Sequence, residues 1–135
     1  MEQQLAAVTA LRETVAYHGW EFQLGDLELL VFINPKAQPE VRFLAQLSYE
    51  DYPQKAPSLA FVNPDTKEPG REFWPQKGKA FAAAVSRNPP QLCIEGVREY
   101  HEQLHSGAQF IPEVHTLAKL LDSMQAELDA GYQAQ

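Results

Sequence analysis

The chain is short and acidic, and both properties limit the classes of protein to which it can belong. Its 135 residues suit one domain built around one core, and we expect that single domain to span residues 1–135. The formal net charge of −7 comes from acidic residues spread along the sequence. A chain of this sign is a poor electrostatic match for nucleic acid or an anionic membrane, so we expect neither as a partner.

The amino terminus and the cysteine content predict the compartment. The first residues carry no basic region and no long apolar run follows them, so no signal peptide is predicted. The most apolar run, residues 27–33, is too short to span a bilayer. The single cysteine, Cys93, cannot form an internal disulfide, which suits a reducing environment. Together these features predict a cytoplasmic protein.

The first half of the chain has the pattern of a helix followed by an antiparallel sheet. Apolar residues recur with a period near 3.6 over residues 4–18, which predicts an amphipathic helix ending at Gly19. Gly25 and Asp26 then predict a turn between the first two strands. The second strand is apolar on nearly both faces, so we expect both of its faces to be covered. The four strands of this meander are predicted over residues 20–24, 27–33, 41–49 and 58–62.

The second half of the chain begins with a polar segment rich in proline and glycine. Trp74 lies within it and is predicted to anchor the segment to the core. A short helical turn is predicted over residues 79–85. Pro112 and Glu113 suit the first turn of a final helix, predicted over residues 113–130. The apolar stripe that would pack this helix on the sheet consists of Val114, Leu117, Leu121, Met124 and Leu128.

Cys93 lies in a segment unlike the periodic runs around it. Pro89 and Pro90 precede it and exclude a central strand or a helix interior, and Gly96 permits a sharp turn after it. The sequence therefore predicts an ordered surface loop, where reactive groups are commonly placed. The alternative is a buried structural thiol, because free cysteine often behaves as a small hydrophobic residue.

Residues 43–61, FLAQLSYEDYPQKAPSLAF, carry the most specific local pattern. This pattern resembles the ubiquitin-conjugating (E2) enzymes, in which a third strand leads to an acidic and aromatic segment like Tyr52-Pro53. A second proline, here Pro57, then precedes the fourth strand. Cys93 falls where the thioester cysteine of that family lies. The resemblance covers about residues 4–130 and implies an α+β, UBC-like fold: an N-terminal helix, a four-stranded antiparallel meander, a catalytic-cysteine loop and a central C-terminal helix.

The chain departs from eukaryotic E2 enzymes near the cysteine. It lacks their His-Pro-Asn tripeptide, and only Asn88-Pro89 lies near Cys93, at a shorter spacing. The helices that usually follow the central helix are also absent from the sequence. Residues 93–101, CIEGVREYH, resemble instead the bacterial E2-like families. These are conjugating components of operons that encode a ubiquitin-like protein, an E1 and a JAB-type protease, some of which act in antiphage defence.

This resemblance implies a transferase that uses neither cofactor nor metal. Its partners would be a ubiquitin-like protein, an E1-like activating enzyme and a protein target. The Cys93 thiolate would attack the E1-bound thioester and pass the acyl group on, because sulfur is both nucleophilic and a good leaving group. Arg98 or a protonated His101 would stabilise the thiolate. Asn88 or a backbone N–H near Gly96 would meet the tetrahedral oxyanion.

The residue that accepts a proton from the incoming nucleophile has three candidates. These are His101, Glu95 and Glu99, which all lie within loop reach of the cysteine. We favour the histidine because Arg98 and Tyr100 flank it. For Arg98 and the glutamates, a solvated loop face is the alternative interpretation. The predicted catalytic set is Cys93, His101 and Asn88.

Three other functions stay open from the sequence. His101 and His105 have the i, i+4 spacing of a helical zinc site, and Cys93 and His115 would complete a set of four ligands. The second alternative is a module of the same fold that binds a ubiquitin-like protein with an inert Cys93. The third is a cysteine hydrolase, which needs a Cys–His pair oriented by another group.

Overall fold

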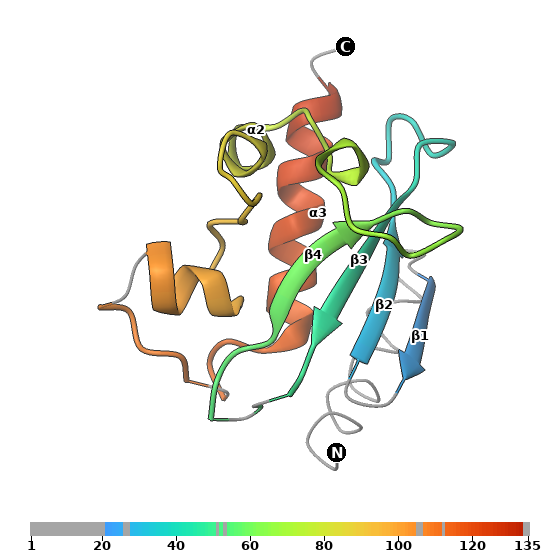
Figure 1. Cartoon of the computed structure of the whole chain (residues 1–135). Coiled ribbons are helices and arrows are strands. Elements are labelled where there is room, and N and C mark those ends of the chain that lie inside the picture. Colours follow the sequence, from blue (N-terminus) through green and yellow to red (C-terminus); the bar gives the residue numbers. More distant parts are fainter. Residues whose placement is uncertain are drawn as a thin grey trace.

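The structure, a computed structural model, describes residues 21–25, 28–50, 52, 54–104, 107–111 and 113–133 (Figure 1). The helix predicted over residues 4–18, with Gly19 after it, lies outside these ranges. The same is true of Asp26, Pro112 and the candidate zinc ligand His105.

The strands form one antiparallel sheet in the order β1-β2-β3-β4. Leu47 lies opposite Leu29 on one side and opposite Leu59 on the other, so apolar side chains line up across the strands. Strand β4 matches its predicted range, whereas β3 begins two residues later than predicted. The strand bounds are Glu21–Gly25 for β1, Glu28–Ile33 for β2, Phe43–Ser48 for β3 and Ser58–Val62 for β4.

Strand β2 is buried on both faces, as its sequence predicts. Leu29 and Val31 are fully buried on the face that carries the main core, and Leu30, on the opposite face, is 8% exposed. Leu30 belongs to a smaller cluster with Leu44 and Val62, against which Phe32 packs. The antiparallel sheet and the C-terminal helix described next confirm the predicted α+β class.

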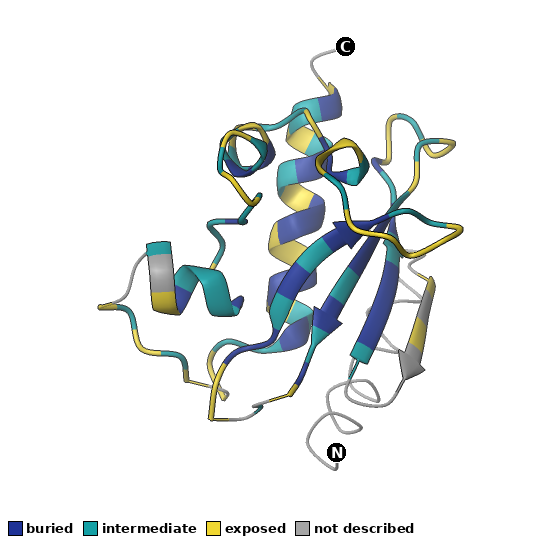
Figure 2. Ribbon diagram, in the orientation of Figure 1, coloured by how far each residue is buried: buried dark blue, intermediate teal, exposed yellow. Residues whose placement is uncertain are grey.

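Helix α3 (Leu117–Gln133) lies across the main face of the sheet (Figure 1). Its buried residues form a continuous stripe, which alternates with exposed positions on the outer side (Figure 2). That stripe consists of Leu117, Leu120, Leu121, Met124, Gln125, Leu128 and Tyr132.

The predicted start of α3 was wrong. The helix begins at Leu117, because Thr116 provides the N-terminal cap: its Oγ1 accepts the Lys119 N–H at 3.3 Å. Val114 therefore precedes the helix and is 48% exposed, so it does not belong to the buried stripe. Glu113 lies in a turn that precedes the helix, and not in the first turn of the helix itself.

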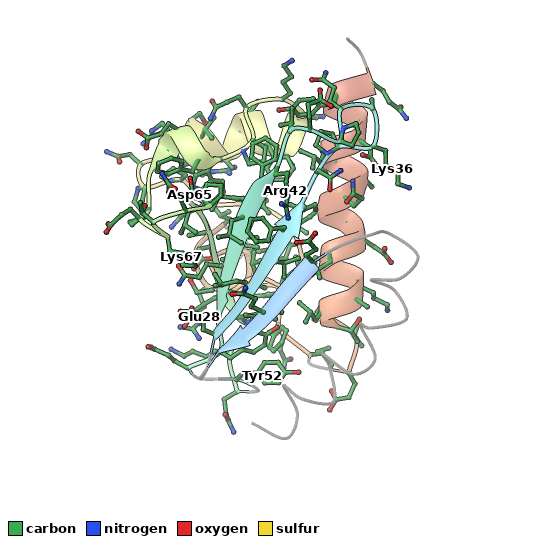
Figure 3. All side chains as sticks on the ribbon, turned by 90° about the vertical axis from the view of Figure 1, so that its right-hand side faces the viewer. Glu28, Lys36, Arg42, Tyr52, Asp65 and Lys67 are labelled. Atoms are coloured by element: carbon green, nitrogen blue, oxygen red, sulfur yellow. The ribbon has the colours of Figure 1, made fainter. Side chains whose placement is uncertain are left out.

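The loop between β2 and β3 fixes the C-terminal half of α3. Gln125, which is buried, donates from Nε2 to the Asn34 carbonyl oxygen at 2.9 Å. Asp129 Oδ1 accepts the backbone N–H of Lys36 at 2.9 Å. Figure 3 shows Lys36 beside this end of α3, whereas Tyr52 lies at the opposite end of the sheet. These two contacts tie the β2–β3 loop to the C-terminal half of α3.

Three shorter helices complete the described chain. Trp74, just after η1 (Arg71–Phe73), is buried and its ring centroid lies 5.1 Å from that of Phe61, which confirms its predicted anchoring role. Helix α2 (Lys79–Val85) matches its predicted range. The third is η2 (Tyr100–Leu104), which follows the cysteine loop. Within the described residues, none of the helices has the length and apolar character needed to cross a membrane.

Candidate functional site

Cys93 lies on an irregular segment that the core holds on both sides. Leu92, immediately before it, is 1% exposed, and Val97, four residues later, is fully buried. Both residues belong to the main hydrophobic cluster. Cys93 itself is half-buried and forms no disulfide. The segment therefore presents the thiol from a fixed backbone, between the predicted surface position and the alternative of a fully buried thiol.

Tyr100 is linked to the cysteine loop through Glu95. Its hydroxyl donates to Glu95 Oε1 at 3.5 Å, which is a long hydrogen bond. Burial raises the pKa of Tyr100, and the negative charges of Glu95 and of the Cys93 thiolate raise it further. Tyr100 therefore stays protonated, and its hydroxyl is a hydrogen-bond donor to Glu95, two residues after Cys93.

His115 approaches Glu95 from the segment that precedes α3. Its Nδ1 accepts the N–H of Ile111 at 2.9 Å, so in the neutral ring Nε2 carries the proton. Nε2 lies 3.6 Å from Glu95 Oε2. The histidine side chain is 12% exposed and that of Glu95 is 64% exposed. Glu95 thus lies between Tyr100 and His115, with its carboxylate open to solvent.

A cavity of about 300 Å³ opens beside this carboxylate. It lies between the cysteine loop and the first turns of α3. Its lining combines charged and hydroxyl side chains with one exposed apolar residue. The lining residues are Glu95, Val114, His115, Thr116, Lys119, Asp122 and Ser123.

His101 is fixed by hydrogen bonds at both of its ring nitrogens. Nε2 accepts the Gly96 N–H at 3.1 Å, and Nδ1 lies 2.7 Å from the Ala108 carbonyl oxygen, to which it donates. The side chain is buried, with its ring centroid 4.8 Å from that of His115. The lone pair that would accept a proton in catalysis is therefore already bonded. The geometry makes His101 a link between the cysteine turn and residue 108.

Arg98 and Glu99 hold the segment that leads into β4. Arg98 donates from Nε to the Ala56 carbonyl oxygen at 3.1 Å, and its backbone N–H donates to the Pro57 carbonyl oxygen at 2.8 Å. Glu99 accepts the Ser58 hydroxyl at 2.8 Å and the Leu59 N–H at 3.2 Å. These contacts give both charged residues a structural role at the sheet, away from the roles proposed for them at the thiolate and the base.

Asn88 has its contacts at a different place from the cysteine. Its Oδ1 accepts from Arg71 Nη2 at 3.4 Å, while Arg71 Nη1 donates to the carbonyl oxygens of Val85 and Arg87. Asn88 also lines an apolar cavity of about 360 Å³, and Cys93 does not line it. The other lining residues are Ala60, Phe61, Pro69, Gly70, Arg71, Trp74, Pro89 and Pro90. The structure therefore joins Asn88 to Arg71 and gives it no contact with the thiol among the described residues.

Of the zinc ligands considered from the sequence, His101 and His115 lie side by side, with ring centroids 4.8 Å apart. Within the described part of the chain, no three histidine, cysteine or acidic side chains lie close enough together to hold a metal ion. His101 would have to give up one of its two hydrogen bonds to become a ligand. His105 lies outside the described residues, so the complete set of four cannot be assembled from them.

Searches of protein-family models and of curated proteins find no match to this sequence. The site is therefore interpreted from its own geometry. The sequence alone identified Cys93 and included Glu95 among three candidate bases, but it gave no reason to join Glu95 to Tyr100 and His115. Those residues lie 5 and 20 positions away, and neither spacing corresponds to a shared face of a helix or strand.

Proposed function

We propose that this chain is an E2-like conjugating enzyme of the bacterial cytoplasm. It accepts a ubiquitin-like protein from an E1-like activating enzyme as a thioester on Cys93 and transfers it to a protein target, within a conjugation operon of the antiphage type. The observation that carries the proposal is a half-buried cysteine, held between buried Leu92 and Val97, on a loop whose Glu95 accepts a hydrogen bond from the Tyr100 hydroxyl. A meander followed by a cysteine loop and a packed C-terminal helix supports a UBC-like fold.

The chemistry of loading follows from these neighbours. The Cys93 thiolate attacks the thioester carbonyl carbon of the E1-bound protein, a new C–S bond forms, and the E1 thiolate leaves. Negative charge builds on the carbonyl oxygen before that bond breaks. Tyr100, whose hydroxyl donates to Glu95 two residues after Cys93, is the donor proposed for this oxyanion, in the role that the sequence assigned to Asn88.

The test uses the purified chain with the activating enzyme and the ubiquitin-like protein of its own operon, and ATP. We expect the wild type to form a covalent adduct that excess thiol cleaves. Cys93→Ser should give a thiol-resistant ester or load poorly, because a hydroxyl is far less ionised than a thiol near neutral pH. Cys93→Ala should form no adduct and remain folded, as the thiol is only half-buried.

Two results would overturn the proposal. An adduct that persists in Cys93→Ala would place the chemistry on another residue. A wild-type chain that binds the ubiquitin-like protein but forms no adduct with active E1 would instead indicate a non-catalytic binding module. A fluorescently labelled ubiquitin-like protein separates these results, because gel mobility reports the adduct and anisotropy reports binding.

A further inference from the structure

The cavity of about 360 Å³ beside β4 differs in its charges from the two cavities near the cysteine segment. One of those two combines Glu95 with Lys119 in its lining, and the other combines Glu102 with Lys55. The cavity beside β4 has Arg71 as the one charged residue of its described lining, and no carboxylate. We call it the Arg71 cavity.

Aromatic and proline side chains supply most of the surface of the Arg71 cavity. Phe61 is fully buried and Trp74 is 3% exposed, and their ring centroids lie 5.1 Å apart, so this part of the lining is firmly packed. Pro69, Pro89 and Pro90 also line the cavity. A proline offers no backbone N–H to a ligand. The lining therefore favours an apolar side chain, in a space at the small end of the range of about 300–1,000 Å³ that ligand pockets cover.

The guanidinium of Arg71 is held by oxygen atoms that carry no formal charge. Its Nη1 donates to the carbonyl oxygens of Val85 and Arg87, and its Nη2 donates to Asn88 Oδ1 at 3.4 Å. These contacts use three of the five N–H donors of a guanidinium group. Within the described chain, Arg71 has no carboxylate partner, so the positive charge at the cavity is not neutralised.

Arg87 brings a second positive charge to this region. Its backbone oxygen accepts the hydrogen bond from Arg71 at 3.0 Å, and its own Nη1 donates to the Gln91 carbonyl oxygen at 2.7 Å. Both belong to the connection that runs from β4 through α2 towards the cysteine segment (Figure 1). Residues 63–90 contain five basic and three acidic residues, in a chain whose formal net charge is −7. This connection is therefore the basic part of an acidic protein.

We propose that the Arg71 cavity binds an extended acidic segment of a partner protein. One apolar side chain of that segment enters the cavity, and Asp or Glu side chains on either side of it pair with Arg71 and Arg87. Charge-assisted hydrogen bonds to a guanidinium are among the stronger polar contacts in proteins. Two cations suit a run of acidic side chains better than a chain terminus, which brings a single carboxylate.

A nucleic acid fits this surface less well than an acidic peptide does. The net negative charge of the whole chain repels a long polyanion, whereas a short segment responds mainly to the charges within about 8 Å of it. The prolines of the lining also offer no N–H groups to phosphate oxygens. Cys93 does not line the cavity, so binding needs no thioester and the inference does not depend on the proposed function.

Asn88 provides a way to cancel the charge of Arg71 without removing the arginine. Asn88→Asp keeps nearly the same shape and turns a neutral acceptor of Arg71 into a carboxylate. The resulting ion pair should keep or raise the melting temperature, and it should also repel an acidic ligand. A purely structural role of these residues would not separate stability from binding in this way.

The experiment measures binding to the full chain by fluorescence anisotropy, with three labelled pools of short peptides whose termini are blocked. The first pool has one aliphatic or aromatic residue between Asp and Glu residues, the second has Gly in its place, and the third has Lys in place of the acids. We expect micromolar binding of the first pool, binding about 10-fold weaker for the second, and no saturable binding of the third. Raising the ionic strength from about 0.05 M to about 0.5 M should weaken the first complex by about 10-fold.

Three variants locate the binding site. Asn88→Asp should weaken binding of the first pool by about 10-fold at an unchanged or higher melting temperature. Arg87→Gln leaves the backbone oxygen that Arg71 uses, and it should weaken binding by about 3-fold. Lys55→Gln makes the same charge change at a different cavity and should bind like the wild type. If Asn88→Asp lowers the melting temperature, the comparison of Arg87→Gln with Lys55→Gln decides.

The inference is overturned if the first pool shows no saturable binding to the wild type, or if folded Asn88→Asp binds it equally well. Equal weakening by Arg87→Gln and Lys55→Gln would also contradict it, because net charge alone would then explain the binding. Tighter binding of a single-stranded oligonucleotide than of the first pool would assign the arginines to phosphate instead. These measurements use no E1, so thioester formation on Cys93 is tested separately.

Discussion

The backbone N–H of Gly96 donates a hydrogen bond to Nε2 of His101 at a distance of 3.1 Å. Because Nδ1 of the same ring donates to the Ala108 carbonyl oxygen at 2.7 Å, one buried side chain joins the cysteine turn to the chain before α3. Protonation at Nε2 would place two N–H donors against each other and break this link. The ring is therefore part of the structure that holds Cys93 in place.

His101→Ala should destabilise the fold and should not act on one chemical step. It leaves the Gly96 N–H and the Ala108 carbonyl oxygen without their partner, at a cost of about 1–3 kcal/mol for each group that stays buried. We expect a lower melting temperature, and loading and discharge reduced to the same degree. Glu102→Ala, next to it and exposed, is the control. A selective loss of discharge with normal stability would instead return His101 to the role of proton acceptor.

Gly96→Ala should lower stability, whereas Gly107→Ala should not. Gly96 has a φ of +104°, a conformation that costs a residue with a Cβ about 1–2 kcal/mol. Its new Cβ would lie 3.5 Å from that of Leu120, so the effect comes from the backbone and not from a clash. A Cβ at Gly107 meets nothing within 4 Å. Chemical denaturation of both variants measures the difference, and equal stabilities would contradict the expected strain at Gly96.

Leu121→Ala and Val114→Ala test the corrected start of α3. Leu121 is fully buried, and its truncation should lower the free energy of unfolding by about 2–5 kcal/mol. Val114 is 48% exposed and should change it by less than about 0.5 kcal/mol. Urea unfolding of the two variants gives both values. A large loss for Val114→Ala would mean that the residue packs in the core after all.

Tyr100→Phe should slow loading and discharge together, by about 100-fold each, because an oxyanion forms in both steps of the proposed transfer. Discharge should slow with free lysine and with hydroxylamine alike. Single-turnover assays measure each step. Tyr52→Phe is a suitable control, since that ring belongs to the aromatic contacts near Phe110. Normal rates in Tyr100→Phe would remove its hydroxyl from the mechanism.

Tyr49→Phe should keep or raise stability, although removing a hydroxyl from a buried tyrosine often lowers it. Tyr49 is 3% exposed, and among the described residues its hydroxyl has no hydrogen-bond partner. Losing that unpaired group should raise the free energy of unfolding by about 1 kcal/mol. A clear loss in thermal or chemical unfolding would show that the hydroxyl is satisfied in solution.

The same tyrosine predicts a dependence on pH. Burial, and then Tyr52, raise the pKa of Tyr49 in the folded chain. The unfolded chain loses this proton near pH 10, and the folded chain loses it only at higher pH. The free energy of unfolding should therefore keep its full value below about pH 10 and decrease as the pH rises above it. Tyr49→Phe should weaken this fall without abolishing it, because the pKa values of Tyr52, Tyr100 and Tyr132 are also raised.

Local sequence patterns predicted the elements whose ends are set by residues close to them in the sequence. Strand β4 and helix α2 match their predicted ranges because turn residues and apolar periodicity bound them on both sides. The start of α3 was wrong because Glu113 and Thr116 both suit a helix N-terminus, and the sequence does not say which one the packing selects.

The residues of the candidate site also divide into those that the sequence could identify and those that depend on tertiary structure. Cys93 could be identified because it is the only cysteine. The role of His101 could not be predicted, because it depends on the Gly96 N–H and the Ala108 carbonyl oxygen, which only the folded turn brings to its two nitrogens. The approach of His115 to Glu95 likewise joins residues 20 positions apart through tertiary structure.

The hydrogen bonds that Glu99 accepts from Ser58 and Leu59 also bear on how the molecule can meet other chains. Strand β4 lies at the end of the strand order, where unpaired N–H groups would otherwise invite a strand from a second protein. Glu99 takes the N–H of Leu59 near one end of β4, and Val62 pairs with Pro69 at the other. Little of this border is left for intermolecular sheet extension. We therefore expect little self-association through strand pairing along β4.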